Sequence, residues 1–276
     1  MNTASAISPS ARRAQEYEPV WQELAAAVDA RVAAGERNLS RVVSSVYHEW
    51  RGHDVARANG VAFGEVVALP RSALAGARRA LIAQTVIAAC RPDTSLIVEL
   101  GSGPGLNLCD VFLGGGPPGA AYAGLELTRS GRDCLTKLAA LDAGFDCEAR
   151  FFDYHAPDLR LLDDHRGHLV VFTVHSIEQI REISGELFEQ IIDRADRVSG
   201  IHFEPVGWQI EGRESGRYSS RAYAQSAGYN ENLLQILSEL ESRSRLTVDS
   251  IVPDIFSHKA KNASTLVTWT TAGRAP

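Results

Sequence analysis

The stretch SLIVELGSGPGLN, residues 95–107, decides the fold of this chain. Its first six residues are almost wholly apolar, as expected for a parallel strand that is buried on both faces. The strand leads directly into GSGPG, residues 101–105, and a helical pattern follows. Glycines let the backbone turn tightly and approach a ligand without a Cβ clash, and a helix N-terminus presents unpaired N–H groups. The stretch therefore predicts a strand–loop–helix unit that holds a carboxylate, a ribose or a phosphate.

The residues after this unit continue the same alternation. Further strand candidates are residues 121–127, 147–153, 168–174 and 198–203, and helical patterns at 129–143 and 177–195 separate most of them. This spacing predicts βαβ units and a parallel sheet. Two last strand-like runs, 246–252 and 265–271, have no helix between them, so we expect them to pair as antiparallel neighbours. Residues 91–276 are accordingly expected to form one α/β domain.

The residues before the glycine loop follow a different pattern. Residues 1–13 are small and polar, and we expect them to be disordered. Residues 14–90 are expected to form a helical N-terminal cap that shapes the substrate site, with helical stretches at 17–34, from about 38 to 50, and at 71–89, and without convincing strands. Residues 207–230 fit neither pattern. We expect them to be an insertion over the carboxyl ends of the strands, where α/β sheets bind ligands.

Charge and composition exclude several classes of partner. The chain has 276 residues with 34 acidic and 28 basic side chains, a formal net charge of −6. Nucleic-acid binding relies on clustered Lys and Arg, so no nucleic-acid partner is expected. No apolar run reaches the roughly 18 residues of a membrane span, and residues 1–13 lack the order of a secretion signal. We therefore expect a cytoplasmic protein without a membrane partner; a homodimer is left open.

The cysteines and histidines do not indicate a metal site. The four cysteines form no C-x-x-C pair, and all lie in or beside apolar runs, so we interpret them as buried free thiols. The histidines lack H-x-x-x-H spacing. No metal ligand is predicted.

Two acidic residues at strand ends indicate which ligand the glycine loop holds. Glu126 ends the strand after the loop, about 25 residues past Gly101, near the place where an acid binds a ribose diol in dinucleotide-binding folds. Asp153 ends the following strand, where its carboxylate could accept from adenine's amine, with Tyr154 beside the base. The dinucleotide fingerprint itself is G-x-G-x-x-G. Here the third glycine comes one residue early and a proline intervenes, which disfavours an NAD-dependent oxidoreductase.

At this point the sequence resembles a known family. VELGSGPGLN is similar to the first motif of the class I S-adenosylmethionine-dependent methyltransferases, with Glu126 matching the family's ribose-binding acid and Asp153 its adenine-side acid. VVFTVHSIEQI and IHFEPVG look like the family's fourth and fifth strands, and the terminal pair looks like its antiparallel ending. The resemblance covers about residues 92–272. It implies a Rossmann-like, mostly parallel seven-stranded sheet with an antiparallel C-terminal strand, S-adenosylmethionine as methyl donor and S-adenosylhomocysteine as product.

The cofactor-binding residues follow from the loop and from the resemblance. Glu99 is expected to organise the loop and to reach the cofactor's amino group through water, since a carboxylate inside a sheet needs a partner. The predicted cofactor-binding residues are Glu99, Gly101, Ser102, Gly103, Gly105, Asn107, Glu126, Asp153, Tyr154 and Val174.

The candidates for catalysis lie after the fourth and at the end of the fifth strand of the α/β domain. His175 is placed where this family brings the transferred methyl group, and a histidine suits the removal of a proton from an oxygen nucleophile. A structural histidine bonded to a backbone carbonyl is an equal alternative. Glu178 is expected either to orient His175 or, the favoured interpretation, to cap a helix. Glu204 is the third candidate, facing the pocket.

Aromatic and basic residues in the uncovered segments are candidates for substrate binding. In the cap these are Tyr47, Trp50 and Arg51. In the insertion they are Trp208, Tyr218, Arg221 and Tyr229. The alternative for each group is an ordinary core or surface role.

The leading functional hypothesis is methylation of a small molecule or peptide at oxygen, a hydroxyl or a carboxylate, with His175 as candidate base. N-methylation that relies on positioning alone is the first alternative, and a non-catalytic module that keeps the cofactor loop is the second. Nucleic-acid methylation is disfavoured, because HSIE, residues 175–178, stands where an Asn/Asp-Pro-Pro-aromatic motif would be expected.

Overall fold

The computed structural model describes residues 8–51, 56–163, 165–259 and 261–273, and of residues 49–51 it describes the backbone alone. The N-terminal part contains α1 Pro9–Ala33, α2 Leu39–Arg51, β1 Arg57–Ala62, β2 Glu65–Pro70 and α3 Arg71–Ala89. The elements that follow are β3 Thr94–Leu100, α4 Leu106–Leu113, β4 Ala121–Glu126, α5 Arg129–Ala139, β5 Cys147–Phe151, η1 Arg160–Leu162, β6 His168–Val174, η2 Ile177–Gln179, α6 Gly185–Arg194, β7 Arg197–Glu204, η3 Gly207–Gln209, α7 Arg221–Ala227, α8 Leu233–Ser242, β8 Thr247–Ser257 and β9 Ser264–Thr270.

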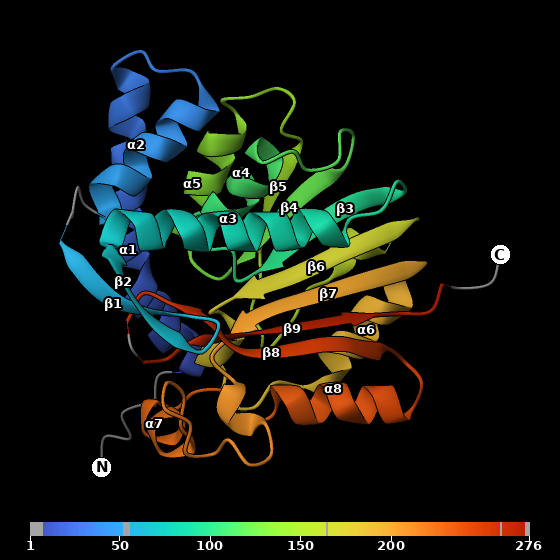
Figure 1. Cartoon of the computed structure of the whole chain (residues 1–276). Helices are drawn as coiled ribbons and strands as arrows, with labels where there is room; N and C mark the ends of the chain where they lie inside the picture. Colours follow the sequence, from blue (N-terminus) through green and yellow to red (C-terminus); the bar gives the residue numbers. More distant parts are fainter. Residues whose placement is uncertain (1–7, 52–55, 164, 260, 274–276) are drawn as a thin grey trace, which may run out of the picture.

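One sheet organises the described residues, with the order β2-β1-β8-β9-β7-β6-β3-β4-β5. Strands β5, β4, β3, β6 and β7 run parallel, and β9 lies antiparallel between β7 and β8. This is the Rossmann-like, mostly parallel arrangement with an antiparallel C-terminal strand that the sequence predicted. The carboxyl ends of the parallel strands lie at one edge of the sheet, so the loops after β3, β4, β5 and β6 are brought together there (Figure 1).

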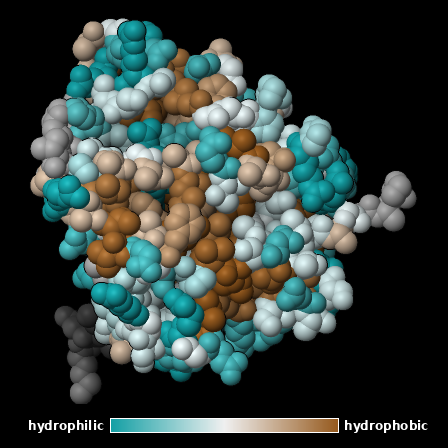
Figure 2. Space-filling model, in the orientation of Figure 1, coloured by the Kyte–Doolittle hydropathy of each residue, from teal (hydrophilic) through white to brown (hydrophobic). Residues whose placement is uncertain are grey.

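Helices cover both faces of the sheet because its central strands are apolar on both sides. Successive residues of β3 alternate between two hydrophobic clusters: Ile97 packs with α1 to α5, whereas Leu96 and Val98 pack with α6 and α8. On the face seen in Figure 2, hydrophobic residues gather below α3, where β7, β8 and β9 lie. None of the helices in the described ranges is both long and apolar enough to cross a membrane.

The region before the glycine loop differs from the predicted helical cap. Residues 57–70 form a hairpin, and Val61 and Ala62 of β1 pair antiparallel with β8. The hairpin extends the predicted seven strands to a nine-stranded sheet among the described residues. Its turn contains Phe63 and Gly64, both with positive φ. A short hairpin at a sheet edge gives only a brief alternating pattern, and Val61 is buried because β8 is already beside it.

The predicted disordered tail also needs correction. Residues 1–7 lie outside the described residues, but Pro9–Arg13 belong to α1. The side chain of Ser8 accepts a hydrogen bond from the amide of Ala11 at 3.2 Å, and Pro9 occupies the first turn. Serine at the N-cap followed by proline is a common helix start. The buried residues of α1 are Leu24, Ala25 and Val28, all in its second half, and Pro19 lies between the halves.

A close backbone approach in the sheet yields a stability prediction. A Cβ on Gly200 of β7 would lie 2.0 Å from the ring of Trp269, which is fully buried on β9. Gly200→Ala should therefore destabilise the fold by about 3 kcal/mol, because the tryptophan cannot move without strain. Gly76 of α3 has nothing within 4 Å of its added Cβ, so Gly76→Ala should stabilise by roughly 0.5–1 kcal/mol. Urea unfolding of both variants checks this, and equal stabilities would contradict it.

Candidate functional site

The glycine loop lies between β3 and α4 with a backbone that other residues rarely adopt. Gly101, Gly103 and Gly105 have φ of +70°, +52° and +77°. A Cβ on Gly101 would lie 2.1 Å from the hydroxyl of Ser176, and one on Gly105 would lie 2.4 Å from Leu135. Glycine is therefore required at these positions both by conformation and by packing. The loop opens onto a cavity of about 1060 Å³, whose wall includes Gly101, Ser102 and Gly103.

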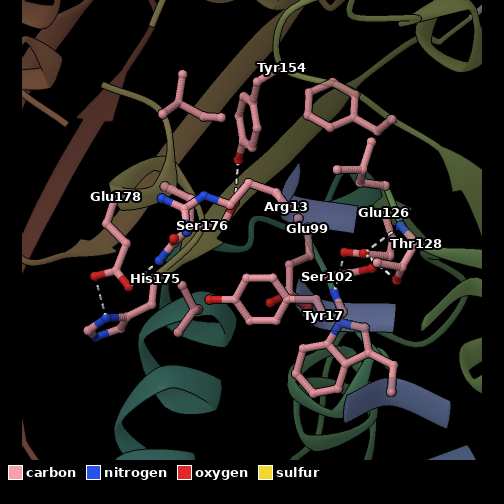
Figure 3. A pocket seen from close by; sticks show the side chains of 18 of the residues that line it. Arg13, Tyr17, Glu99, Ser102, Glu126, Thr128, Tyr154, His175, Ser176 and Glu178 are labelled. Atoms are coloured by element: carbon pink, nitrogen blue, oxygen red, sulfur yellow. Dashed lines mark hydrogen bonds and ion pairs between the residues drawn. The ribbon is translucent and has the colours of Figure 1, made fainter. Parts of the chain in front are cut away.

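Glu126 connects the glycine loop to the start of α5. One of its carboxylate oxygens accepts from the amide of Gly103 at 2.8 Å. The other accepts from the amide and hydroxyl of Thr128 at 2.8 and 2.6 Å. The side chain is buried, yet it lines the cavity. A carboxylate has about four acceptor positions, so Glu126 retains capacity for a hydroxyl donor from the cavity (Figure 3).

Glu99 presents a buried oxygen without a partner on the same cavity wall. Its Oε1 accepts from the side-chain amide of Asn107 at 2.6 Å, whereas Oε2 has no hydrogen-bond partner. Burial raises the pKa of this carboxyl to about 8. The buried hydroxyl of Ser102 likewise lacks a partner. Orphaned buried polar atoms that face a cavity are suited to receive a ligand's polar groups.

Asp153 and Tyr154 follow β5, and both line the cavity. Asp153 Oδ1 accepts from the amide of His155 at 2.9 Å, so it also shapes its own turn. The Tyr154 hydroxyl lies 3.2 Å from the carbonyl of Leu100 and within hydrogen-bond distance of Ser176. Burial raises the pKa of Tyr154 well above its usual value. Tyr154 therefore ties the turn after β5 to the end of β3.

Residues of the first helix close the cavity from the other side. Tyr17 and Trp21 stack with their ring centroids 5.9 Å apart. Trp21 lies directly against the glycine loop, since a Cβ on Gly103 would be 3.0 Å from its ring. Burial and the charges of Glu178 and other neighbours raise the pKa of Tyr17. In Figure 3, Tyr17 lies between Glu178 on one side of the cavity and Glu99 and Glu126 on the other, with Arg13 nearby.

Hydrogen bonds hold this helix to α5. The carboxylate of Glu18 accepts from the amides of Arg129 and Ser130, each at 3.0 Å. The Ser130 hydroxyl donates to the carbonyl of Glu18 at 3.0 Å. These are the first amides of α5, which an acidic group at a helix N-terminus stabilises. The wall formed by α1 is thereby fixed beside Thr128 and Glu126.

His175 has both ring nitrogens engaged by the protein. Nδ1 lies 2.9 Å from a carboxylate oxygen of Glu178, and Nε2 lies 2.7 Å from the hydroxyl of Ser264. The backbone of His175 has φ +54°, which costs energy in a residue with a Cβ. His175 and Glu178 line the cavity (Figure 3). Of the two expected roles of Glu178, the contact with His175 corresponds to orientation.

Glu204 is placed differently from its expected position. It is fully buried and does not line the cavity. Its two oxygens accept from the amides of Ser176, Ile177 and Glu178 at 3.0 to 3.1 Å. The capping that the sequence assigned to Glu178 is thus made by Glu204. This placement corrects its assignment as a catalytic residue facing the pocket, because a side chain at the end of β7 points under the loop after β6.

Of the remaining cofactor candidates and the substrate-binding candidates in the N-terminal cap, only some line the cavity. Val174 and Asn107 line the cavity. Tyr47 also lines it, but its hydroxyl donates to Asp110 at 3.2 Å and Arg79 lies 3.7 Å above its ring. Trp50 and Arg51 lie in the last turn of α2, and their side chains are outside the described residues.

The aromatic residues of the insertion do not line the main cavity. Trp208 is buried beside a smaller cavity with Arg221, and Tyr218 packs with Val61 and Ala263. Tyr229 packs edge-on against Tyr223. The part of the insertion on the cavity wall is residues 225–228, at the end of α7. The side chains of the four substrate-binding candidates in this segment thus pack locally, and none of them lines the main cavity.

Several cavity residues were not found by sequence reasoning. Arg13, Tyr17 and Trp21 belong to the helix that was predicted in part to be disordered, and Arg78 and Arg79 come from α3. The i, i+4 spacing of Tyr17 and Trp21 was a signal for an aromatic face. Nothing in the sequence pattern indicates that Ser264, 89 residues away, contacts His175. Among the described residues no group of three or more His, Cys, Asp or Glu is placed to hold a metal ion.

The fold of this chain is similar to that of several solved structures. No protein-family model and no curated protein matches it. An O-methyltransferase from Bacillus cereus in complex with SAH is similar to it in fold, with 11% identity, TM-score 0.49, and coverage of 71% of this chain and 81% of that one. An O-methyltransferase family protein from Burkholderia thailandensis is 14% identical, with a TM-score of 0.47. The match covers 73% of this chain and 57% of that protein. A cyclopropane-fatty-acyl-phospholipid synthase-like protein from Lactobacillus casei is 13% identical, with a TM-score of 0.47. The match covers 71% of this chain and 91% of that protein. At these identities the similarity is one of fold alone.

The pKa of Glu99 yields a test of its environment. Its carboxyl titrates near 8 in the fold and near 4.5 when unfolded. The folded state therefore binds the extra proton, so this contribution to stability is present below pH 4.5 and is lost as the pH rises to 8. Glu99→Gln removes the titration. The difference in unfolding free energy between the two proteins should change by about 3 kcal/mol between pH 5 and pH 8. A constant difference would mean that Glu99 is solvated.

Proposed function

We propose that the protein is a methyltransferase that uses S-adenosylmethionine. The observation that carries the proposal is the convergence, on one cavity, of the glycine loop, Glu126 and the unpaired carboxyl oxygen of Glu99. They come from the ends of adjacent strands β3 and β4, where a Rossmann-like sheet binds nucleotides. S-adenosylhomocysteine, the product, occupies the same site.

The polar groups of the cavity fit the parts of this cofactor. Glu126 has acceptor capacity for the ribose hydroxyls, and its carboxylate suits an unphosphorylated ribose, because it would repel a phosphate. Asp153 is placed for the adenine amine, and Phe152 and Tyr154 supply apolar surface beside it. The free oxygen of Glu99 suits an ammonium group, whose charge would draw the carboxyl into its ionised form. Ser102 supplies a further hydrogen-bonding group.

S-adenosylmethionine carries a methyl group on a positively charged sulfur. This methyl group is transferred to a nucleophile by in-line displacement. The contribution of the protein to such a reaction is largely alignment, since a fixed geometry removes much of the entropic barrier. Tyr17 and Trp21 exclude water above the glycine loop, and Tyr154 and Ser176 keep the ends of β3 and β5 together. Excluding water and holding the strand ends together both follow from the contacts of these four side chains.

The acceptor is a small molecule or peptide that carries an oxygen nucleophile. The cavity is lined in part by α1 and residues 225–228, and the net charge of −6 opposes a nucleic-acid backbone. His175 and Glu178 form a hydrogen-bonded pair on the wall, with His175 as the proposed base. Because Ser264 occupies Nε2, an acceptor that needs no base, such as an amine or an ionised carboxylate, is the second candidate. For it, the pair would only position the substrate.

Cofactor binding is the first test of this proposal. S-adenosylhomocysteine should bind the purified protein, and Glu126→Ala should weaken binding by about 1.5–3 kcal/mol, because hydrogen bonds to a charged acceptor are lost. Isothermal calorimetry measures both. Glu148→Ala, an exposed substitution on β5, is the matched control. Binding of NADH without binding of S-adenosylhomocysteine would overturn the proposal.

The role of His175 is tested by kinetics on a true acceptor. If His175 removes a proton during transfer, His175→Ala should lower kcat by about 10²–10⁴-fold, the usual contribution of a general base. The affinity for S-adenosylhomocysteine should stay unchanged, and the rise of rate with pH should disappear. A raised KM with the pH profile intact would instead identify an acceptor that needs no base.

A further inference from the structure

Among the described residues, the rings of His168, His175 and His202 each lie within 3.0 Å of a hydroxyl group, and His175 differs from the other two. His168 lies between Thr94 and Ser199, at 2.7 and 2.9 Å. His202 contacts Thr173 at 3.0 Å and accepts from the indole N–H of Trp269 at 2.9 Å. Neither has a carboxylate partner, and burial lowers their pKa to about 4 and about 3. His175 combines a serine with a carboxylate, and it lines the cavity.

The carboxylate decides the tautomer of His175. An ionised carboxylate only accepts hydrogen bonds, so Nδ1 must carry the proton that is directed at Glu178. The lone pair of the neutral ring then lies on Nε2, and the hydroxyl of Ser264 donates to it. When the ring gains a proton, Nε2–H donates instead, and the same hydroxyl oxygen accepts. Ser264 can therefore hold the ring in one orientation in both protonation states.

The order serine, histidine, acid is that of a hydrolase triad, but the positions exclude this function. Ser264 is 4% exposed and does not line the cavity. Its hydroxyl is therefore not available to attack a substrate. Ser264 is also fixed by its strand, since it pairs with Phe256 at the start of β9. The remaining function of such a hydroxyl is to hold its partner.

We propose that Ser264 is a positioning residue of the site, which fixes the imidazole plane of His175 at Nε2 while Glu178 fixes it at Nδ1. This inference rests on the proposed function, because it is the acceptor beside His175 that requires a fixed ring. The left-handed backbone of His175 and the anchoring of the following loop by Glu204 bring the ring within reach of β9. The orientation of the ring is thus set by three elements: β9, the loop after β6, and β7.

The expected effect of removing the hydroxyl has a definite sign. A hydrogen bond from a charged donor is stronger than one from a neutral donor, so Ser264 stabilises the cationic ring more than the neutral ring. Ser264→Ala should therefore weaken the binding of a proton to the His175 ring by about three- to tenfold, the usual contribution of one hydrogen bond. The other ionisable groups that interact with His175 or Glu178 are Glu204, Tyr17 and Tyr229.

The test is a titration of the ring nitrogens by NMR on the full-length protein with ¹⁵N-labelled histidine. The His175 signals are assigned by their loss in His175→Gln. In the wild type the neutral ring should show protonated Nδ1 and unprotonated Nε2. Ser264→Ala should shift the midpoint downward, and Ser264→Thr, which restores a hydroxyl, should return it. Ser199→Ala removes the equivalent contact of His168 and should leave His175 unchanged.

Two outcomes would overturn the inference: an unaltered His175 titration in Ser264→Ala, or a shift that Ser264→Thr does not reverse. If the alanine variant fails to fold, Ser264→Cys retains a similar volume with much weaker hydrogen bonding and should give the same downward shift. Calorimetry with S-adenosylhomocysteine on the same samples separates the two levels. If the wild-type protein does not bind S-adenosylhomocysteine, the proposed function is refuted. If it binds normally but the His175 titration is unchanged in Ser264→Ala, only the role of Ser264 is refuted.

Discussion

The carboxylate of Glu126 is the interaction on which the arrangement of the cavity depends. It accepts from the glycine loop through Gly103 and from the start of α5 through Thr128. Thr128 in turn caps α5, whose first amides are bound by Glu18 of α1. One buried anion thus links β4, the glycine loop, α5 and the first helix. A buried charge is stable only when its hydrogen bonds are satisfied, so each of these elements has to be in place together.

A second buried carboxylate organises the opposite side of the cavity in the same way. Glu204 holds three consecutive amides after β6, and the loop that it anchors carries His175 and Glu178. Burial raises the pKa of Glu204, and the three amides oppose this by stabilising its ionised form. Each side of the cavity is therefore built on a carboxylate at a strand end, Glu126 or Glu204, that accepts hydrogen bonds from backbone amides.

The sequence was sufficient where structure follows from local pattern. The boundaries of β6 and α3 could be predicted to the residue, because the one is a continuous apolar run and the other an uninterrupted helical pattern. The hairpin at 57–70 could not, since its burial depends on β8, almost 200 residues later. The same reason separates Glu99 and Glu126, which adjoin a recognisable motif, from Ser264 and Trp21, which reach the cavity through tertiary packing. Aromatic residues at 208–229 misled because composition alone does not indicate which way a side chain points.

The proline in α1 affects how fast a ligand can enter and leave the cavity. Pro19 removes one hydrogen bond from the helix interior, and the part before it contributes no fully buried side chain. That part nevertheless closes the cavity, with Glu18 as its attachment to α5. The first half of α1 can therefore open by local unfolding at a free energy far below that of the whole molecule. For a ligand held under Tyr17, the residence time therefore depends on the opening of about three turns of helix, Pro9–Glu18.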